Sequence, residues 1–160
     1  MKKIEIKGKS YFGKYDHVRA ACRAVILDET RILLSYEAKN DVWMIPGGGI
    51  EEGETDEQCV IREVAEETGN LFEPAECVLE LDEYYEGTKY ISKYFVGRIV
   101  GSTDTHLTEA EIQGGLESRW IPIEDALAVF STHQRITDFE EKRGLYQREY
   151  AALKEMLKKQ

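Results

Sequence analysis

Basic side chains are in short supply in this sequence. Only 21 Lys and Arg face 31 Asp and Glu, which gives a formal net charge of −10. A broad basic surface for a nucleic-acid polymer or an anionic membrane is therefore not expected. No apolar run approaches the roughly 20 residues of a membrane-spanning helix. Residues 1–7 also lack the apolar centre of a secretion signal, so we expect neither secretion nor a membrane partner.

Cysteine and proline are also scarce, with three of each. Cys22, Cys59 and Cys77 lie far apart and form no C-x-x-C motif, which argues against a disulfide scaffold or a zinc ribbon. Because this usage suits a reducing compartment, we expect a cytoplasmic protein. The length of 160 residues suits one domain. We therefore predict a single domain over 1–160, in which 1–17 form an N-terminal strand extension.

Strand-like and helix-like segments are mixed along the chain. Apolar or alternating runs predict strands at 4–7, 18–27, 31–35, 42–45, 77–81, 90–100 and 118–121. Helical periodicity predicts helices at 55–68, 123–130 and 138–157. Hairpins mixed with helices indicate an α/β domain around a mixed sheet. The amphipathic segment 138–157 can pack on this domain or mediate a homodimer, and the sequence leaves both open.

The negative charge is concentrated between residues 47 and 70, where eight acids accompany one base, Arg62. The helix predicted at 55–68 has clear ends. Thr55 and Gln58 form a capping box at its start, and Gly69 suits the position that ends it. An acidic run is often only a solvated face, but apolar residues are interleaved here and strand-like segments lie on both sides.

Three acids of this helix, Glu63, Glu66 and Glu67, share a face that spans about 100°. The face lies beside a stripe predicted to be buried, formed by Val60, Ile61, Val64 and Ala65. Like charges this close repel each other, and a divalent cation would neutralise them. Ligation by oxygen alone favours Mg²⁺ or Mn²⁺.

A glycine run, Gly47 to Gly49, stands immediately before this acidic segment. Glycines permit close backbone approach and unusual φ values. A carbonyl of this loop can ligate a metal, and its N–H groups can meet a phosphate. A triple glycine alone is weak support for such a site, and its fixed offset from the charged helix strengthens it.

Gly48, Glu54 and residues 62–69 together follow the pattern G-x5-E-x7-R-E-U-x-E-E-x-G-U, in which U is a bulky aliphatic residue. Segment 48–70 therefore resembles the Nudix box. Asn70 departs from the last aliphatic position, and we expect Leu71 to fill its packing role one residue later. Segments 43–48 and 120–127 also resemble parts of this family, so the resemblance spans 18–130.

The resemblance implies an α/β/α sandwich around a mixed sheet. It also implies Mg²⁺-dependent hydrolysis, with Mn²⁺ as a substitute, of a nucleoside diphosphate linked to another moiety X. The substrate is then a small nucleotide or polyphosphate. The implied metal ligands are the Gly47 carbonyl and the carboxylates of Glu63, Glu66 and Glu67.

Further roles follow from the same motif match. Glu63 is also implied to act on the attacking water, Glu54 lies at or near the metal, and Arg62 holds the carboxylates in place. A general base from outside the box is the alternative to Glu63. The candidates are three glutamates of the loop at 107–118, of which we favour Glu111 over Glu109 and Glu117.

Substrate contacts are less well defined by the sequence. Arg23 lies in an apolar strand, where a charge is costly unless it pairs with a phosphate or an acid. The backbone of Gly48 can approach a phosphate. Trp43 can stack on a base, as can Tyr36, Tyr84 and Tyr85, although aromatics near glycine loops are often core residues.

Two other functions are compatible with the motif. One is a nucleotide sensor that binds without cleavage, although such modules usually lose box glutamates and this chain keeps them. The other is isopentenyl-diphosphate isomerase chemistry, for which Cys59 is the nearby cysteine.

Overall fold

Two β-sheets form the centre of the computed structural model, which describes residues 1–158. Residues 159–160, the end of the predicted domain, lie outside the described residues. The five-stranded sheet has the spatial order β1 (Lys2–Lys7), β7 (Asn70–Tyr85), β8 (Gly87–Ser102), β2 (Tyr15–Val25) and β6 (Gly47–Gly49). Strand β1 is parallel to β7 and β2 to β8, whereas β7–β8 and β2–β6 are antiparallel. The sheet is therefore mixed, as predicted.

The second sheet is built on β4 (Arg31–Glu37). Strand β9 (Leu116–Pro122) pairs with the whole of β4 along one edge. The other edge pairs with β3 (Leu27–Asp28) at one end and with β5 (Val42–Met44) at the other. All pairs in this sheet are antiparallel, and β5 leads directly into the glycine run.

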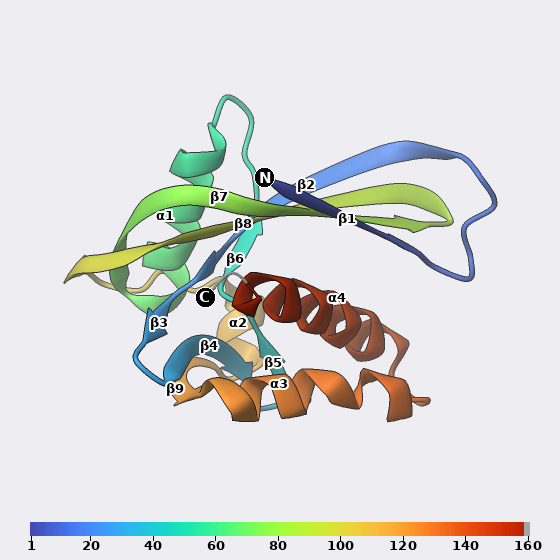
Figure 1. Ribbon diagram of the computed structural model, residues 1–160. Coiled ribbons are helices and arrows are strands. Elements are labelled where there is room, and N and C mark those ends of the chain that lie inside the picture. Colours follow the sequence, from blue (N-terminus) through green and yellow to red (C-terminus); the bar gives the residue numbers. More distant parts are fainter. Residues whose placement is uncertain (159–160) are drawn as a thin grey trace.

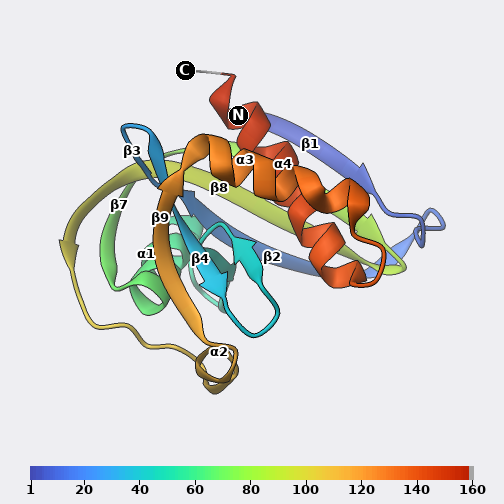
Figure 2. The ribbon, with the colours of Figure 1, turned by 90° about the horizontal axis from the view of Figure 1, so that it is seen from below.

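The helices lie on both sides of the sheets. They are α1 (Asp56–Thr68), α2 (Glu109–Gln113), α3 (Ile123–Ser131), the 3-10 helix η1 (Thr132–Arg135) and α4 (Glu140–Leu157). Figure 1 shows α3 and α4 below the five-stranded sheet and α1 behind β7 and β8. Seen from below, α3 and α4 lie in front of the strands and α1 lies beyond them (Figure 2). The predicted α/β/α sandwich is confirmed. None of the helices within residues 1–158 has the length and hydropathy to cross a bilayer.

Alternating side chains of the central strands fill two cores, one against each helix layer. On β2, Cys22 and Ala24 point to the α1 side, whereas Val25 points to the side of α3 and α4. The α1 side is completed by Cys59, Val60, Val64, Phe72 and Phe95. Helix α4 is buried through Tyr146, Ala152, Leu153 and Met156, so it packs on the domain.

Several element boundaries differ from the prediction. Strands β7 and β8 extend well beyond the predicted 77–81 and 90–100, because they pair with each other along nearly their full length. The glycine run forms β6, which was not predicted, by pairing with residues 21–23 of β2. Helix α2 was also not predicted, and it begins at a capping box of Thr108 and Glu111.

Helix α1 begins at the predicted capping box and ends at Gly69, whose φ is 72°. Its rotation differs from the prediction, because Ile61, expected in the buried stripe, is 38 % exposed. The buried positions are instead Cys59, Val60, Val64 and Glu67, so the helix is turned toward its acidic edge. Leu71 is likewise 40 % exposed, and Phe72 supplies the packing expected of it. This rotation brings the box acids under the glycine run.

Candidate active site

The guanidinium of Arg62 holds three of the box carboxylates. Its Nε and Nη2 donate to the two oxygens of Glu54, at 2.6 and 3.0 Å. Its Nη1 donates to Glu63 Oε1 at 2.9 Å and to Glu66 Oε2 at 3.2 Å. Nη2 also donates to the carbonyl oxygen of Gly49 at 3.0 Å. One side chain therefore ties the acids of α1 to each other and to the glycine run.

These contacts set the charge states around Arg62. Its hydrogen bonds lower the pKa of Glu54 to about 2. Burial raises the pKa of Glu63, although hydrogen bonding and the charge of Arg62 oppose this effect. The pKa of Arg62 itself is raised, first by its hydrogen bond to Glu54. The guanidinium and the Glu54 carboxylate are thus both ionised at neutral pH.

Glu67 lies on the buried side of the same helix and is 5 % exposed. Its Oε1 accepts a hydrogen bond from Ser35 Oγ at 2.6 Å, and its Oε2 accepts one from the Gly47 amide at 3.3 Å. Burial raises the pKa of Glu67 to about 7, and these two neutral donors lower it only in part. Within residues 1–158, no basic side chain forms an ion pair with this carboxylate.

The first two glycines of β6 lie in close contacts, with the backbone of β2 at Gly47 and with the end of the Glu63 side chain at Gly48. A Cβ on Gly47, whose φ is 154°, would lie 2.2 Å from the Cys22 carbonyl oxygen. A Cβ on Gly48 would lie 2.5 Å from the Glu63 carboxylate. Gly49 differs, because the nearest atom to its Cβ position is the Ala20 carbonyl oxygen at 3.9 Å. The backbone thus passes directly over the acidic face of α1.

The donor set fits a divalent cation of the hard class. It consists of carboxylate oxygens of α1 beside backbone carbonyls of β6, and it includes a buried glutamate that forms no ion pair within residues 1–158. Across residues 1–158, no three Asp, Glu, His or Cys side chains are already arranged as a metal cluster. The reason is visible in the contacts, since Arg62 binds Glu63 and Glu66 while Ser35 binds Glu67. Metal binding would therefore compete with Arg62 for two of these side chains.

Helix α2 brings Glu111 toward this acidic face. The charge of Glu111 contributes to raising the pKa values of both Glu63 and Glu67, so it lies within electrostatic reach of them. Its carboxylate accepts a hydrogen bond from the Thr108 amide at 2.9 Å. The loop before α2 is fixed to α1, because the His106 amide donates to the Glu66 carbonyl oxygen at 2.8 Å.

Arg23 lies on β2 directly opposite Gly47. Its Nε is buried and has no hydrogen-bond partner within residues 1–158. Its charge lowers the pKa of Glu67 and of Glu83 on β7, so it acts on both. Arg23 thus lies beside the glycine run and acts electrostatically on buried acids, and both alternatives for its role stay open.

Trp43 is not brought to the acidic face. It pairs with Tyr36 across β5 and β4, whereas Ser35, the next residue on β4, contacts Glu67. Adjacent strand residues point to opposite faces, so the Trp43 ring lies on the side of α3 and α4. There the centroid of the Trp43 ring lies 4.4 Å from that of the Tyr36 ring. The guanidinium carbon of Arg119 lies 5.7 Å from the Trp43 centroid.

Two residues at this site were not anticipated from the sequence. Ser35 contacts Glu67, and Glu149 of α4 accepts a hydrogen bond from the Ile45 amide at 2.6 Å. Ser35 is a polar residue that ends an apolar strand. Glu149 stands among the apolar positions of the predicted amphipathic helix, four residues before Leu153. In both cases, a polar residue at a position where the pattern predicts an apolar core residue indicates a buried polar contact.

Comparisons with known proteins agree with this geometry. The family model of the NUDIX domain matches residues 17–145. The putative nudix hydrolase 1 of Caenorhabditis elegans is 34% identical over 125 residues, which are 74% of this chain and 33% of that protein. The mouse diphosphoinositol polyphosphate phosphohydrolase 3-alpha is 31% identical over 121 residues, 74% of this chain and 71% of that protein. A solved NUDIX hydrolase from Nitrosomonas europaea has a TM-score of 0.61 and 26% identity, covering 84% of this chain and 88% of that one.

The fold and the site together define a class of protein, the α/β/α sandwich that carries a complete set of box acids. Because the family model covers most of its length, this chain belongs to the Nudix family. The match extends past the predicted limit of 130 into the first turns of α4. The chain spans only about a third of the length of the C. elegans relative.

Proposed function

We propose that this protein is a divalent-metal-dependent pyrophosphohydrolase that cleaves a nucleoside diphosphate linked to another moiety X. The observation that carries the proposal is the grouping of box carboxylates around Arg62, directly beneath the glycine run. A helix that needed only solubility would not hold two of its acids and one acid of the preceding loop on one guanidinium and bury a further acid.

The residues that would hold the metal are Glu63, Glu66 and Glu67, together with the Gly47 carbonyl. Bound Mg²⁺ or Mn²⁺ would supply Lewis-acid chemistry, withdrawing charge from the phosphate oxygens and orienting the diphosphate. Arg62 orients two of these carboxylates, a role for which its planar fork is suited. Arg23, which lies opposite Gly47 on β2, is the candidate cation for a phosphate of the substrate.

The reaction is the attack of water on one phosphorus of the diphosphate. A new bond forms between the water oxygen and that phosphorus, and the bond from the same phosphorus to the bridging oxygen breaks. A carboxylate accepts the proton of the water, with Glu63 and Glu111 as the two candidates. The products are a nucleoside monophosphate and phosphorylated X.

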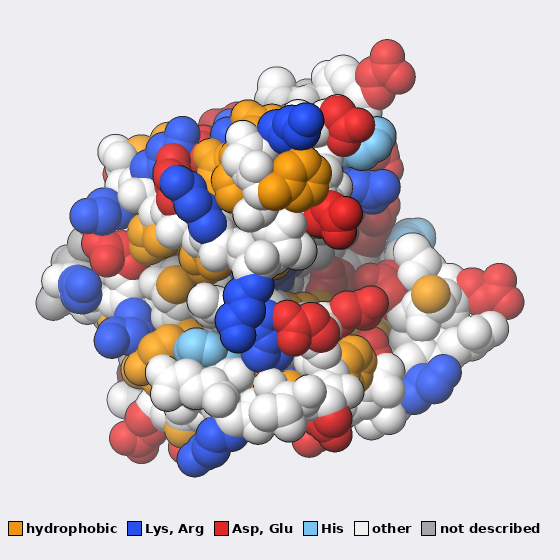
Figure 3. All heavy atoms as spheres, turned by 90° about the vertical axis from the view of Figure 1, so that its right-hand side faces the viewer, with side chains coloured by type: hydrophobic (Ala, Val, Ile, Leu, Met, Phe, Trp, Pro, Cys, Tyr) orange, Lys and Arg blue, Asp and Glu red, His pale blue; other side chains and the backbone are white. Residues whose placement is uncertain are grey.

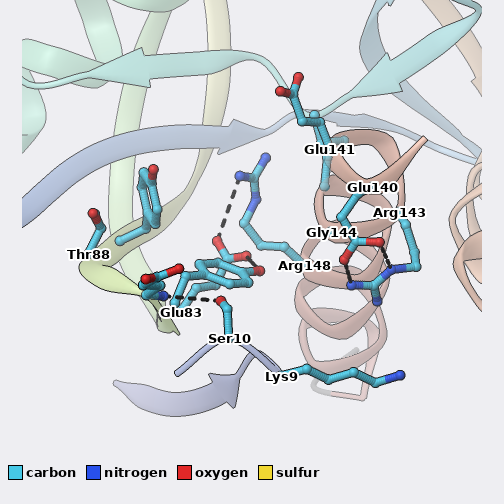
Figure 4. A pocket seen from close by; sticks show the side chains of 13 residues that line it. Lys9, Ser10, Glu83, Thr88, Glu140, Glu141, Arg143, Gly144 and Arg148 are labelled. Carbon is cyan, nitrogen blue, oxygen red and sulfur yellow. Dashed lines mark hydrogen bonds and ion pairs between the residues drawn. The ribbon is translucent and has the colours of Figure 1, made fainter. Parts of the chain in front are cut away.

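A pocket of about 560 Å³ offers space for X. It lies between the N-terminal half of α4, the turn that joins β7 to β8, and the loop at Lys9 and Ser10 (Figure 4). Arg148 in its wall donates to Glu149, the residue that binds the Ile45 amide two positions before Gly47. The pocket is thereby connected with the backbone that leads into the glycine run.

The charge of this pocket disfavours an X that carries several phosphates. Its wall contains three bases, Lys9, Arg143 and Arg148, and four acids, Glu83, Glu86, Glu140 and Glu141. On the side of the molecule where β7 turns into β8, acidic and basic side chains are mixed over the surface (Figure 3). The rings of Tyr85 and Tyr90, whose centroids lie 6.0 Å apart, offer an apolar surface. A nucleoside or a sugar is therefore the better occupant.

The deciding experiment is hydrolysis of a substrate panel with and without Mg²⁺. The panel contains nucleoside triphosphates, oxidised triphosphates, ADP-ribose, dinucleoside polyphosphates, nucleotide sugars and a diphosphoinositol polyphosphate. We expect Mg²⁺-dependent cleavage of a nucleotide member and poor cleavage of the inositol compound. Tight binding without cleavage of any member would establish the sensor instead.

The structure does not place Cys59, the candidate cysteine of the isomerase alternative, where it could reach a substrate. Cys59 is completely buried, and its Sγ donates to the Gly48 carbonyl oxygen at 3.5 Å. A catalytic thiol must reach its substrate, so the placement of Cys59 argues for a packing role.

A further inference from the structure

Backbone amides along the edge of β5 that faces away from β4 donate hydrogen bonds to side chains of α4. Among the strands of residues 1–158, β5 pairs with β4 alone. On its other side, the Trp43 amide donates to Tyr146 Oη at 3.0 Å, and the Ile45 amide donates to Glu149 Oε2 at 2.6 Å. The C-terminal helix thus takes the place of a neighbouring strand along the segment that leads into the glycine run.

The segment from Ile45 to Gly47 is fixed from three directions. Glu149 of α4 accepts from the Ile45 amide, and Glu67 of α1 accepts from the Gly47 amide. Between them, the carbonyl oxygen of Pro46 accepts from an amide of β2 at 2.9 Å. A buried glutamate from each helix layer therefore holds one end of this three-residue segment.

The charge of Glu149 is maintained although the side chain is completely buried. Burial opposes its ionisation, but the charges of Arg148 and Arg23 hold its pKa below the ordinary value. Tyr94 Oη donates to Oε1 at 2.7 Å, and Arg148 Nε donates to the same oxygen at 3.1 Å. Arg148 also forms an ion pair with Glu83 at 3.8 Å (Figure 4).

A buried carboxylate is costly unless it is fully satisfied by hydrogen bonds and opposite charge. Its placement is explained by what it binds. The Ile45 amide is buried beyond the reach of water and would otherwise lack a partner. A charged acceptor also makes a shorter and stronger bond than a neutral one.

We infer that Glu149 is a positioning residue for the proposed reaction. By fixing the Ile45 amide, it fixes the carbonyl of Gly47, the backbone group assigned to the metal, and the approach of Gly48 to Glu63. This inference rests on the proposed function and adds a part of the site that lies far outside the box. The C-terminal helix would then be a component of the catalytic centre as well as a cover for the core.

The test measures Mn²⁺ binding to the full chain by electron paramagnetic resonance, without substrate. In Glu149→Gln one of the two acceptor oxygens becomes an NH₂ donor, so the Ile45 amide and Arg148 Nε, which can only donate, cannot both keep an acceptor. We expect Mn²⁺ to bind about 10-fold or more weakly, as is found when residues that orient metal ligands are replaced. In activity assays, raised Mg²⁺ should restore kcat while the KM for substrate stays near that of the wild type.

Tyr146→Phe is the matched control, because it removes the other link between α4 and β5 and leaves the Ile45 link in place. We expect this variant to lose thermal stability and to bind Mn²⁺ within about twofold of the wild type. If Glu149→Gln binds Mn²⁺ as the wild type does, or if both variants weaken it equally, the inference is wrong.

A measurement on the wild type covers the case in which Glu149→Gln does not fold. Coupling between sites is reciprocal, so Mg²⁺ should slow hydrogen exchange of the Ile45 amide at least severalfold. Unchanged exchange would overturn the inference. Mn²⁺ binding by a wild type that cleaves no panel member would instead overturn the proposed function and leave the link between Glu149 and the metal intact.

Discussion

Arg62 grips Glu54 at two points, with Nε 2.6 Å from Oε2 and Nη2 3.0 Å from Oε1. Residues of a loop and a helix, eight positions apart, are thereby locked together. The remaining guanidinium nitrogen faces Glu63 and Glu66. Arg62 therefore fixes the positions of Glu54, Glu63 and Glu66 relative to one another.

Replacement of Arg62 by Ala should raise the pKa of Glu54 from about 2 toward its ordinary value of 4.5. In the wild type this depressed pKa stabilises the fold above about pH 4.5, and the contribution is lost as the pH falls toward 2. The unfolding free energy of the variant should therefore depend less on pH in that range. Carboxyl ¹³C NMR without metal measures the pKa, and Arg98→Ala, which removes an exposed ion pair, is the control. An unchanged Glu54 pKa would contradict the role given to Arg62.

Replacement of Glu67 by Gln should abolish most Mg²⁺-dependent hydrolysis, by at least about 100-fold in kcat, because a metal ligand is lost. The fold should persist, since the amide keeps the volume and removes a buried charge. Thermal melting provides a second reading. At 100 times its dissociation constant, Mg²⁺ should stabilise the wild type by about 2.7 kcal/mol and the variant by much less. Glu57→Gln, on the exposed face of α1, should behave as the wild type.

Alanine at Gly48 and at Gly49 should have opposite outcomes. A Cβ at Gly48 would lie 2.5 Å from the Glu63 carboxylate, whereas one at Gly49 has no atom closer than 3.9 Å. Gly48→Ala should therefore displace Glu63 and lower kcat at least about 10-fold, with little loss of stability, because the carboxylate is the end of a flexible side chain that can move. In Gly49→Ala, kcat should stay within about twofold of the wild type and the unfolding free energy within about 0.5 kcal/mol. Equal effects of the two substitutions would refute this account of the loop.

Replacement of Glu111 by Gln tests the general base. If Glu111 accepts the proton of the water, kcat should fall about 10²–10⁴-fold while KM and Mg²⁺ affinity change little. Glu109→Gln, on the same short helix, serves as the control because it removes the same charge from α2, whereas Glu111 is the acid of this helix whose charge acts on Glu63 and Glu67. A Glu111→Gln variant with full kcat would assign the base to Glu63.

Much of the site was predictable because its determinants are local in the chain. The capping box at Thr55 and Gln58, the terminal Gly69 and the spacing of the acids lie within one loop and one helix. Helical geometry alone places Glu63, Glu66 and Glu67 on one face. The mixed sheet and the layered fold also followed from the alternation of apolar segments.

The glycine run and the acidic helix could be predicted from the order of residues, because backbone geometry relates residues that are near in the chain. The tertiary structure decided the rotation of α1, which exposes Ile61 and buries Glu67. It also turned Trp43 to the opposite face of its sheet from Ser35, and it brought Glu149 to Ile45 across more than 100 positions. Such contacts depend on how the sheets and helices pack against each other, and no periodicity within a single segment contains that information.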